Sequence, residues 1–163
     1  MIKYIFQYLL ASALLLFSTF AAWYEGSEIR DNPWEWKYSA FFSKMFNGEI
    51  TNSADISQLD HFIYAAKFSP IYPTFIIVSL SYILILSLYL LLKRYKRSLI
   101  VLLFSFGILY LLLGGIVADS PTIGGKYFMS VFIAIGILNF IMSFLFYLKF
   151  RRNGKVVSSS LLN

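Results

Sequence analysis

The sequence contains no cysteine, and histidine occurs once among its 163 residues. Without cysteine there are no disulfides, thiolate metal sites or thiol–disulfide catalysis, so any segment outside a membrane is held by packing alone. Charge is scarce as well, since Asp, Glu, Lys and Arg make up 13% of the chain, against roughly 25% in soluble domains. A chain so poor in charge is typical of a membrane protein.

Four apolar runs, residues 5–23, 74–92, 99–118 and 127–148, contain no Asp, Glu, Lys, Arg or His. Each is close to the roughly 20 residues that cross a hydrocarbon core of about 30 Å. The short connections 93–98 and 119–126 favour antiparallel neighbours. The sequence therefore predicts a single all-α membrane domain, a four-helix transmembrane antiparallel bundle. Because coupled transporters and proton relays need ionisable groups at depth, their absence argues against those classes.

The first run has a second interpretation, as a cleaved secretory signal. Lys3 precedes it, and residues 19–21 (Thr-Phe-Ala) resemble a cleavage site. Residues 5–22 are longer than the 7 to 15 residues typical of a signal core, so we expect a retained anchor. Cleavage would leave the direction of the other spans unchanged.

Lysine and arginine predict the orientation. With the N-terminus inside, the cytoplasmic side carries nine basic residues and no acid, whereas the outer side carries five basic residues and all eight acids. Since cytoplasmic loops carry the Lys and Arg excess, we expect a multi-pass plasma-membrane protein with both termini cytoplasmic and a tail at 149–163. This placement explains the net charge of +6 without nucleic acid. The candidate headgroup and topology residues are Lys93, Arg94, Lys96, Arg97, Arg151 and Arg152.

The loop at 24–71 is extracytoplasmic in this topology and has room for a site. A connection of this length should carry structure or function, and its aromatic content argues against disorder. We predict one helix from Asn32 as N-cap and Pro33 to Asn47-Gly48. A second helix, over 55–68, has an apolar face with Ile56, Leu59, Phe62, Ile63 and Ala66. Together they form a helical hairpin cap; a strand is the alternative, because residues 34–38 also alternate in polarity.

Aromatic residues of the first loop helix are the candidate partner-binding residues: Trp34, Trp36, Tyr38, Phe41 and Phe42. Within the bundle, Asn139 is the most polar residue in the middle of a span. We expect it to hydrogen-bond between two helices, a contact of about 1 kcal/mol.

Catalytic chemistry has little support in the sequence. His61 is the single histidine, and its neighbour Asp60 would point about 100° away from it on a helix instead of orienting the ring. No serine lies in a recognisable nucleophile motif, and no pair of residues has metal-ligand spacing. We therefore expect His61 to be a loop residue, with no metal, no cofactor and no enzymatic activity.

Three functions remain open at this point. The first is a non-enzymatic interaction or accessory protein that presents the aromatic loop to membrane lipids or to another membrane or envelope protein. The second is an oligomeric pore or small-solute permease with a polar stripe. The third is an interfacial enzyme that uses His61 with an outer carboxylate. The candidate stripe residues are Ser79, Ser81, Ser105, Asn139 and Ser143.

Three stretches, residues 21–27 (AAWYEGS), 32–39 (NPWEWKYS) and 54–60 (ADISQLD), resemble small uncharacterised four-helix membrane proteins of Bacillus-type bacteria (YjdJ-like, a domain of unknown function). The resemblance implies a bacterial plasma membrane and brings no activity or catalytic residue with it. The layout also resembles claudin-like proteins in outline. Their loop motif ends in a cysteine pair that this chain lacks, so that likeness is one of topology alone.

Overall fold

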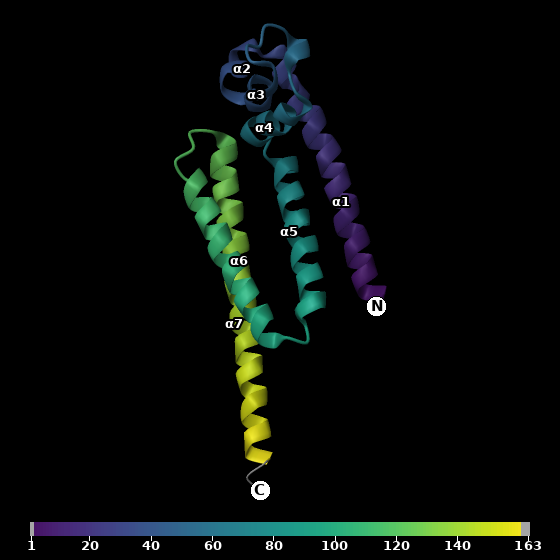
Figure 1. The fold of residues 1–163 in the computed structure, drawn as a ribbon, viewed down its shortest axis with the longest axis vertical. Helices are drawn as coiled ribbons and strands as arrows, with labels where there is room; N and C mark the ends of the chain where they lie inside the picture. The colour runs from purple at the N-terminus through teal and green to yellow at the C-terminus, as the bar shows by residue number, and fades with distance from the viewer. Residues whose placement is uncertain (1, 161–163) are drawn as a thin grey trace. The chain divides into compact units, whose positions relative to one another are not determined.

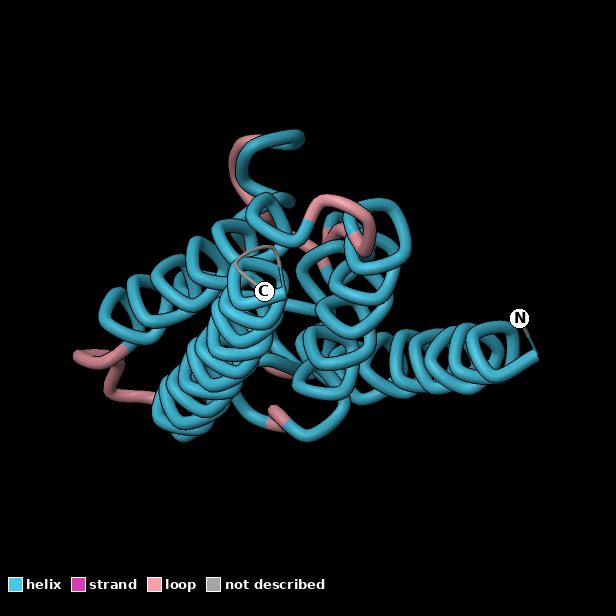
Figure 2. The backbone as a smooth tube through the Cα atoms, turned by 90° about the horizontal axis from the view of Figure 1, so that it is seen from below, coloured by secondary structure: helices cyan, strands magenta, loops and turns pink. Residues whose placement is uncertain are grey.

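The computed structural model describes the backbone of residues 2–160 and the side chains of residues 2–152, and its regular structure is helical. The described part holds no strand (Figures 1 and 2), so the all-α class is confirmed and the strand alternative for residues 34–38 is wrong. The elements are α1 Ile2–Gly26, η1 Ser27–Asp31, α2 Pro33–Ser39, α3 Phe41–Asn47, η2 Ser53–Asp55, α4 Gln58–Phe68, α5 Ile71–Leu92, α6 Lys96–Val117 and α7 Ile123–Ser160.

Four helices, α1, α5, α6 and α7, are long and apolar enough to cross a membrane. They coincide with the four runs of the sequence because no proline or charged residue interrupts those runs. The predicted tail at 149–163 begins as a continuation of α7, which extends to Ser160. Residues 161–163 of that tail, and the side chain of its Lys155, lie outside the described residues.

Contacts divide the chain into two compact units. The first contains residues 1–84 and 120–128, and with them α1 and the whole loop. The second contains residues 85–119 and 129–163, and with them α6 and most of α7. Helices α5 and α7 each contribute residues to both units.

In the second unit, α6 and α7 pack with opposite chain directions. Gly107 contacts Phe140, and Gly114 lies opposite Ile133. A glycine lets two helices approach closely, because no side chain separates the main chains. The polar contact across the pair comes from Ser143, whose hydroxyl donates to Ile100 O at 3.0 Å. The short connection at 119–126 therefore joins two antiparallel helices, as the sequence predicts for this pair.

In the first unit, the loop departs from the predicted pair of helices. The helix predicted over 32–47 is broken at Ala40, where φ is −91° and ψ is 60°, so α2 and α3 are separate. The cause is tertiary: Ala40 is buried, and the break turns the first amides of α3 towards a carboxylate on α4. Helix α3 ends as predicted, at Gly48 with φ of 77°. The second helix begins later than predicted, after Ser57 as N-cap.

Candidate functional site: an aromatic surface on a hydrogen-bonded cap

Residues 27–68, from η1 to α4, form a small folded body that we call the cap. Its interior consists of Ile29, Ala40, Ile56 and Tyr64, with Trp36 packed against them. Two of these residues add directional bonds. The Trp36 indole donates to Ile29 O at 2.8 Å, and the Tyr64 hydroxyl accepts from the Asn32 amide at 3.0 Å. The cap therefore holds its shape with no disulfide, by a few apolar residues and the polar ends of two aromatic ones.

Asp60 on α4 connects to the start of α3. Its fully buried carboxylate accepts hydrogen bonds from Phe42 N at 2.8 Å, from Ser43 N at 2.7 Å and from the Ser43 hydroxyl. The Ser43 oxygen in turn accepts from Ser57 N at 2.7 Å. A carboxylate at this position satisfies amides that the first turn of a helix leaves without partners and complements the helix dipole. Asp60 and its N-cap neighbour Ser57 thus join the start of α4 to the start of α3, which precedes Asp60 by 17 residues in the sequence.

A second polar link joins α2 to α4. The Lys67 ammonium donates to the Glu35 carboxylate at 2.6 Å, and the Ser39 hydroxyl donates to the same oxygen at 2.9 Å. The Lys67 hydrogen bond, followed by that of Ser39, holds the pKa of the Glu35 carboxyl below its ordinary value. Lys67 also lies 5.6 Å from the centre of the Tyr38 ring. Glu35, in the first turn of α2, therefore connects this helix to α4.

The buried face of α4 is the polar one. Asp60 and His61 are buried together with Tyr64 and Ala65, whereas Leu59 of the predicted apolar face is 46% exposed. Hydrophobic periodicity was therefore a wrong guide here, because the hydrogen bonds of Asp60 compensate for its burial. His61 lies on the second predicted loop helix, with 1% of its surface exposed and its ring 5.8 Å from that of Trp23.

Close approach of main chains fixes α4 in place. Gly26, at the end of α1, lies directly against the main-chain carbonyl of His61, and Gly124, in the first turn of α7, lies against that of Ala66. Gly124 is a helical residue whose missing side chain makes room for α4. Along α1, Ser18 and Ala22 are fully buried with Gly26 at a spacing of four residues, in agreement with the small-residue pairing typical of close helix contacts.

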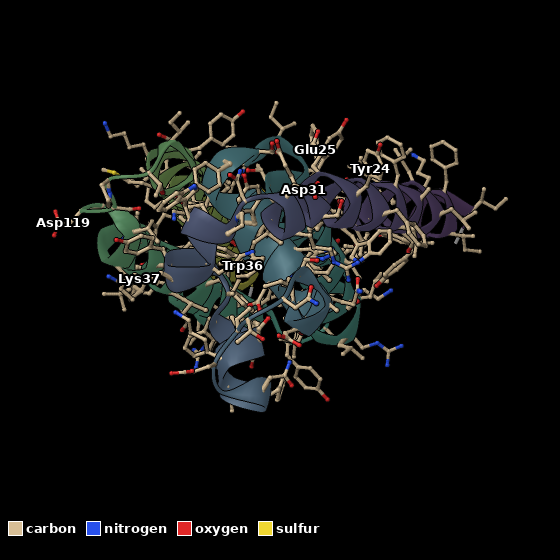
Figure 3. All side chains as sticks on the ribbon, turned by 90° about the horizontal axis from the view of Figure 1, so that it is seen from above. Tyr24, Glu25, Asp31, Trp36, Lys37 and Asp119 are labelled. Atoms are coloured by element: carbon tan, nitrogen blue, oxygen red, sulfur yellow. The ribbon has the colours of Figure 1, made fainter. Side chains whose placement is uncertain are left out.

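The candidate partner-binding residues fall into two groups. Trp34, Tyr38 and Phe41 are 87%, 69% and 63% exposed. Trp36 is half-buried and packs against the interior of the cap, whereas Phe42 is half-buried with its ring beside those of Phe41 and Phe46. Viewed from the side of the cap, Trp36 lies between Lys37 on one side and Glu25 and Asp31 on the other (Figure 3). We call the exposed large side chains of α2 and α3 the aromatic surface: Trp34, Tyr38, Phe41, Met45 and Phe46.

The residues of the pore and enzyme hypotheses are also visible. Ser81, Ser105 and Asn139 donate to carbonyls four residues earlier in their own helices, so an interhelical bond from Asn139 stays a prediction. In the part of the chain whose side chains are described, neither ring nitrogen of His61 has a hydrogen-bond partner. The Asp60 carboxylate does not orient the ring, because it bonds to the first amides of α3. Among the described residues no group of three His, Asp or Glu side chains could hold a metal.

Acid should weaken the cap through His61. Burial lowers the pKa of His61 below its ordinary value, and the charge of Arg30 adds to this, while the main chain of Trp23 and the charge of Asp60 oppose it. The unfolded chain therefore binds a proton at a pH where the folded cap does not. We expect full stability above about pH 6.5, the ordinary histidine value, and a loss of stability as the pH falls from there towards the lower folded-state pKa.

The measurement is the thermal midpoint of the cap between pH 5 and pH 8, followed by intrinsic fluorescence. The three tryptophans of the chain, Trp23, Trp34 and Trp36, all lie in or beside the cap, so the signal reports on this body. The matched control is His61→Gln, which removes the titrating group and should flatten the profile over this range. An equal pH dependence in both proteins would contradict the role of His61.

The fold and the cap define a class: a small all-α protein with four long apolar helices compatible with a membrane and a folded cap between the first two. The chain belongs to the family described as "Domain of unknown function (DUF4306)", which it matches over residues 5–92. A curated relative, described as "Uncharacterized protein YjdJ" of Bacillus subtilis (strain 168), is 40% identical over 73 residues, 44% of this chain and 67% of the relative. The predicted YjdJ-like resemblance is confirmed. No solved structure matches the chain.

Proposed function

We propose that this protein is a non-enzymatic integral membrane protein that binds another membrane or envelope protein through the aromatic surface. The observation that carries the proposal is the exposure of Trp34, Tyr38 and Phe41 on a cap whose buried interior is formed by other residues. Large apolar side chains gathered on one surface mark interaction sites in soluble parts of proteins. Tryptophan and tyrosine are also the residues that most often dominate binding energy.

The geometry of the cap supports this proposal, because the surface is prepared in advance. The break at Ala40, the Asp60 bonds to α3 and the Glu35–Lys67 pair determine the angle between α2 and α3. A surface that is already ordered loses little conformational entropy when a partner binds. The half-buried Trp36 belongs to this support, and the exposed faces of Trp34, Tyr38 and Phe41 can contact a partner.

The proposal includes the topology. We infer a four-helix antiparallel bundle with both termini in the cytoplasm and the cap outside, in a bacterial plasma membrane. The Lys and Arg asymmetry of the loops supports this orientation. The exposure of Lys93, Arg94, Lys96, Arg97, Arg151 and Arg152 is consistent with a place at the headgroups. Under this topology the aromatic surface lies where an envelope partner can reach it.

The test is site-specific photo-crosslinking in native membranes. A photoreactive phenylalanine analogue at position 34 or 38 should yield one adduct of defined mass. The same analogue at position 24 should not, since Tyr24 is 75% exposed but lies outside the aromatic surface. The triple variant Trp34→Ala, Tyr38→Ala, Phe41→Ala should reduce the adduct formed from position 45 by at least tenfold, because each anchor contributes about 1 kcal/mol or more.

The tryptophan emission of the triple variant, which keeps Trp23 and Trp36, shows whether its cap is still folded, because Trp36 packs against the cap interior and donates to Ile29 O. Adducts of equal yield from positions 24, 34 and 38 would mean that the crosslinks are non-specific. An unchanged adduct in the triple variant would overturn the proposed partner surface.

A further inference from the structure

One end of the second unit is strongly basic. Lys93, Arg94, Lys96 and Arg97 are exposed around the α5–α6 turn, and Arg151 and Arg152 are exposed on α7. Among the described residues of this unit, the single carboxylate is that of Asp119, beyond the opposite end of α6. The basic end therefore has no acidic side chain of its own unit to neutralise it.

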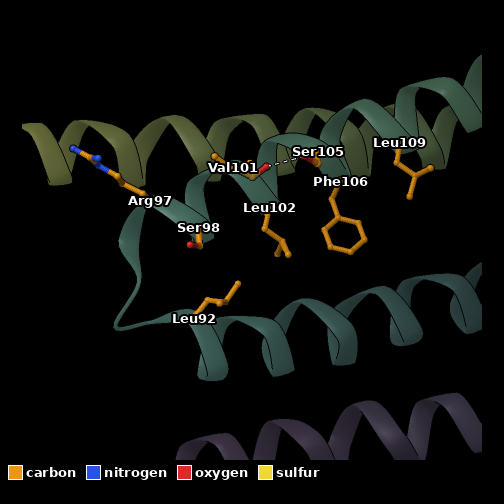
Figure 4. Close-up of a pocket in the computed structure, with 8 residues that line it drawn as sticks. All are labelled: Leu92, Arg97, Ser98, Val101, Leu102, Ser105, Phe106 and Leu109. Atoms are coloured by element: carbon orange, nitrogen blue, oxygen red, sulfur yellow. Dashed lines mark hydrogen bonds between the residues drawn. The ribbon is translucent and has the colours of Figure 1, made fainter.

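A groove with a cavity of about 650 Å³ begins at this end and runs along α6. Arg97 and Ser98 form its rim, and Leu102, Phe106 and Leu109 continue along its wall. Leu92 of α5 points at the same space, as Figure 4 shows. The Ser105 hydroxyl does not offer its proton to the groove, because it donates to Val101 O at 3.0 Å. Below the rim, the groove is therefore an apolar channel.

The length of the groove corresponds to one leaflet of a membrane. From Ser98 to Leu109 the helix rises by roughly 16 Å, at 1.5 Å per residue. Half of a hydrocarbon core of about 30 Å is roughly 15 Å. A molecule that fills the groove would thus combine an anionic group at the basic rim with one hydrocarbon chain of leaflet depth.

We propose that this groove binds an anionic phospholipid, with one acyl chain along Leu102, Phe106 and Leu109 and the phosphate at Arg97 and Ser98. Charge complementarity selects this occupant, since basic pockets beside membrane helices bind anionic headgroups and arginine binds phosphate by paired hydrogen bonds. The inference rests on the membrane placement in the proposed function and goes beyond it.

The position of Arg97 fits this role. Its guanidinium lies 5.8 Å from the centre of the Phe150 ring, and Figure 4 shows its side chain extending away from Leu92 instead of into the groove. An arginine at a membrane surface places its charge in the headgroup layer while its stem covers apolar surface. The rim then carries the charge, and the wall beneath stays free for a hydrocarbon chain.

Native mass spectrometry of the full chain in detergent tests the proposal, with added phosphatidylglycerol and phosphatidylcholine as ligands. We expect phosphatidylglycerol to be retained at least tenfold more tightly. Arg97→Gln should reduce this preference roughly tenfold, because one charged hydrogen-bond donor is lost. Arg152→Gln removes one charge at the same end without lining the groove, so its preference should stay close to that of the unchanged protein.

A groove-filling variant provides an independent reading. Leu102→Trp should lower the occupancy of phosphatidylglycerol about tenfold, whereas Leu112→Trp, on the same helix outside the groove, should leave it unchanged. Phe106→Trp replaces Leu102→Trp if the latter is not monodisperse. Equal retention of the two lipids, or equal losses in Arg97→Gln and Arg152→Gln, would overturn the site. The triple variant of the aromatic surface should retain phosphatidylglycerol normally, which separates this inference from the proposed function.

Discussion

Replacing Gly26 by alanine should detach α4 from the end of α1 and unfold the cap. The added Cβ would overlap the main-chain carbonyl of His61, and a main chain cannot rotate out of the way as a side chain can. Crowding of this kind in a packed interior costs about 3 kcal/mol or more. Since a marginally stable domain has only about 5 to 15 kcal/mol in total, we expect a large fall in the thermal midpoint of the cap, measured by tryptophan fluorescence.

Two further glycines make this result specific. Gly124→Ala should act in the same way at the other end of α4, because its Cβ would meet the carbonyl of Ala66. Gly115→Ala is the matched control, since a Cβ at this helical position meets no atom within 4 Å. If Gly26→Ala kept the melting temperature and emission of Gly115→Ala, the close contact between α1 and α4 would be wrong.

Replacing Asp60 by alanine should have the second large effect. The change leaves Phe42 N, Ser43 N and the Ser43 hydroxyl without their acceptor in a buried place. Unsatisfied buried donors cost about 1 to 3 kcal/mol each, and the loss of bonds to a charged group adds to this, so we expect a loss of about 4 kcal/mol. Hydrogen exchange at the first turn of α3 measures the change directly, because those amides would open locally.

The control for Asp60 is another capping carboxylate. Asp55 accepts from Asn52 N at 3.0 Å and completes a capping box on η2, but its bonds are exposed to solvent. Asp55→Ala should therefore lower stability much less than Asp60→Ala does, because solvent can replace the lost bonds. Asp60→Asn should fall between the two, since an amide oxygen still accepts one bond while its NH₂ group faces another donor. Equal losses of stability in Asp55→Ala and Asp60→Ala would show that the burial of Asp60 does not increase its contribution to stability.

Signals that depend on neighbours in the sequence were good guides. Uninterrupted apolar runs predict α1, α5, α6 and α7, because a helix satisfies its own main-chain hydrogen bonds. Pro33 begins α2, since its fixed φ suits a first helical position and its missing N–H needs no partner there. Gly48 ends α3 because it adopts a positive φ at little cost. Each of these effects acts within a few residues.

The details of the cap were less predictable, because they depend on contacts between distant residues. Nothing beside Ala40 in the sequence marks a helix break; the bonds from Asp60, about 20 residues later, produce it. Apolar periodicity assigned the wrong face of α4, since it cannot register that a buried carboxylate has three donors. Ser43, a small polar residue among aromatic ones, indicates a polar partner in this part of the cap. Only the fold shows that this partner is Asp60.

The sequence without cysteine, and without charge in its long apolar runs, determined the class of this protein: all-α, with four helices compatible with a membrane. These properties follow from composition and from main-chain hydrogen bonding within one segment. Tertiary structure alone decided which aromatic residues support the cap and which are displayed. Trp34 and Trp36 are two residues apart on one helix, yet one is 87% exposed and the other donates to Ile29 O. That difference depends on where α4 and η1 pack, and packing between distant segments is not encoded in local pattern.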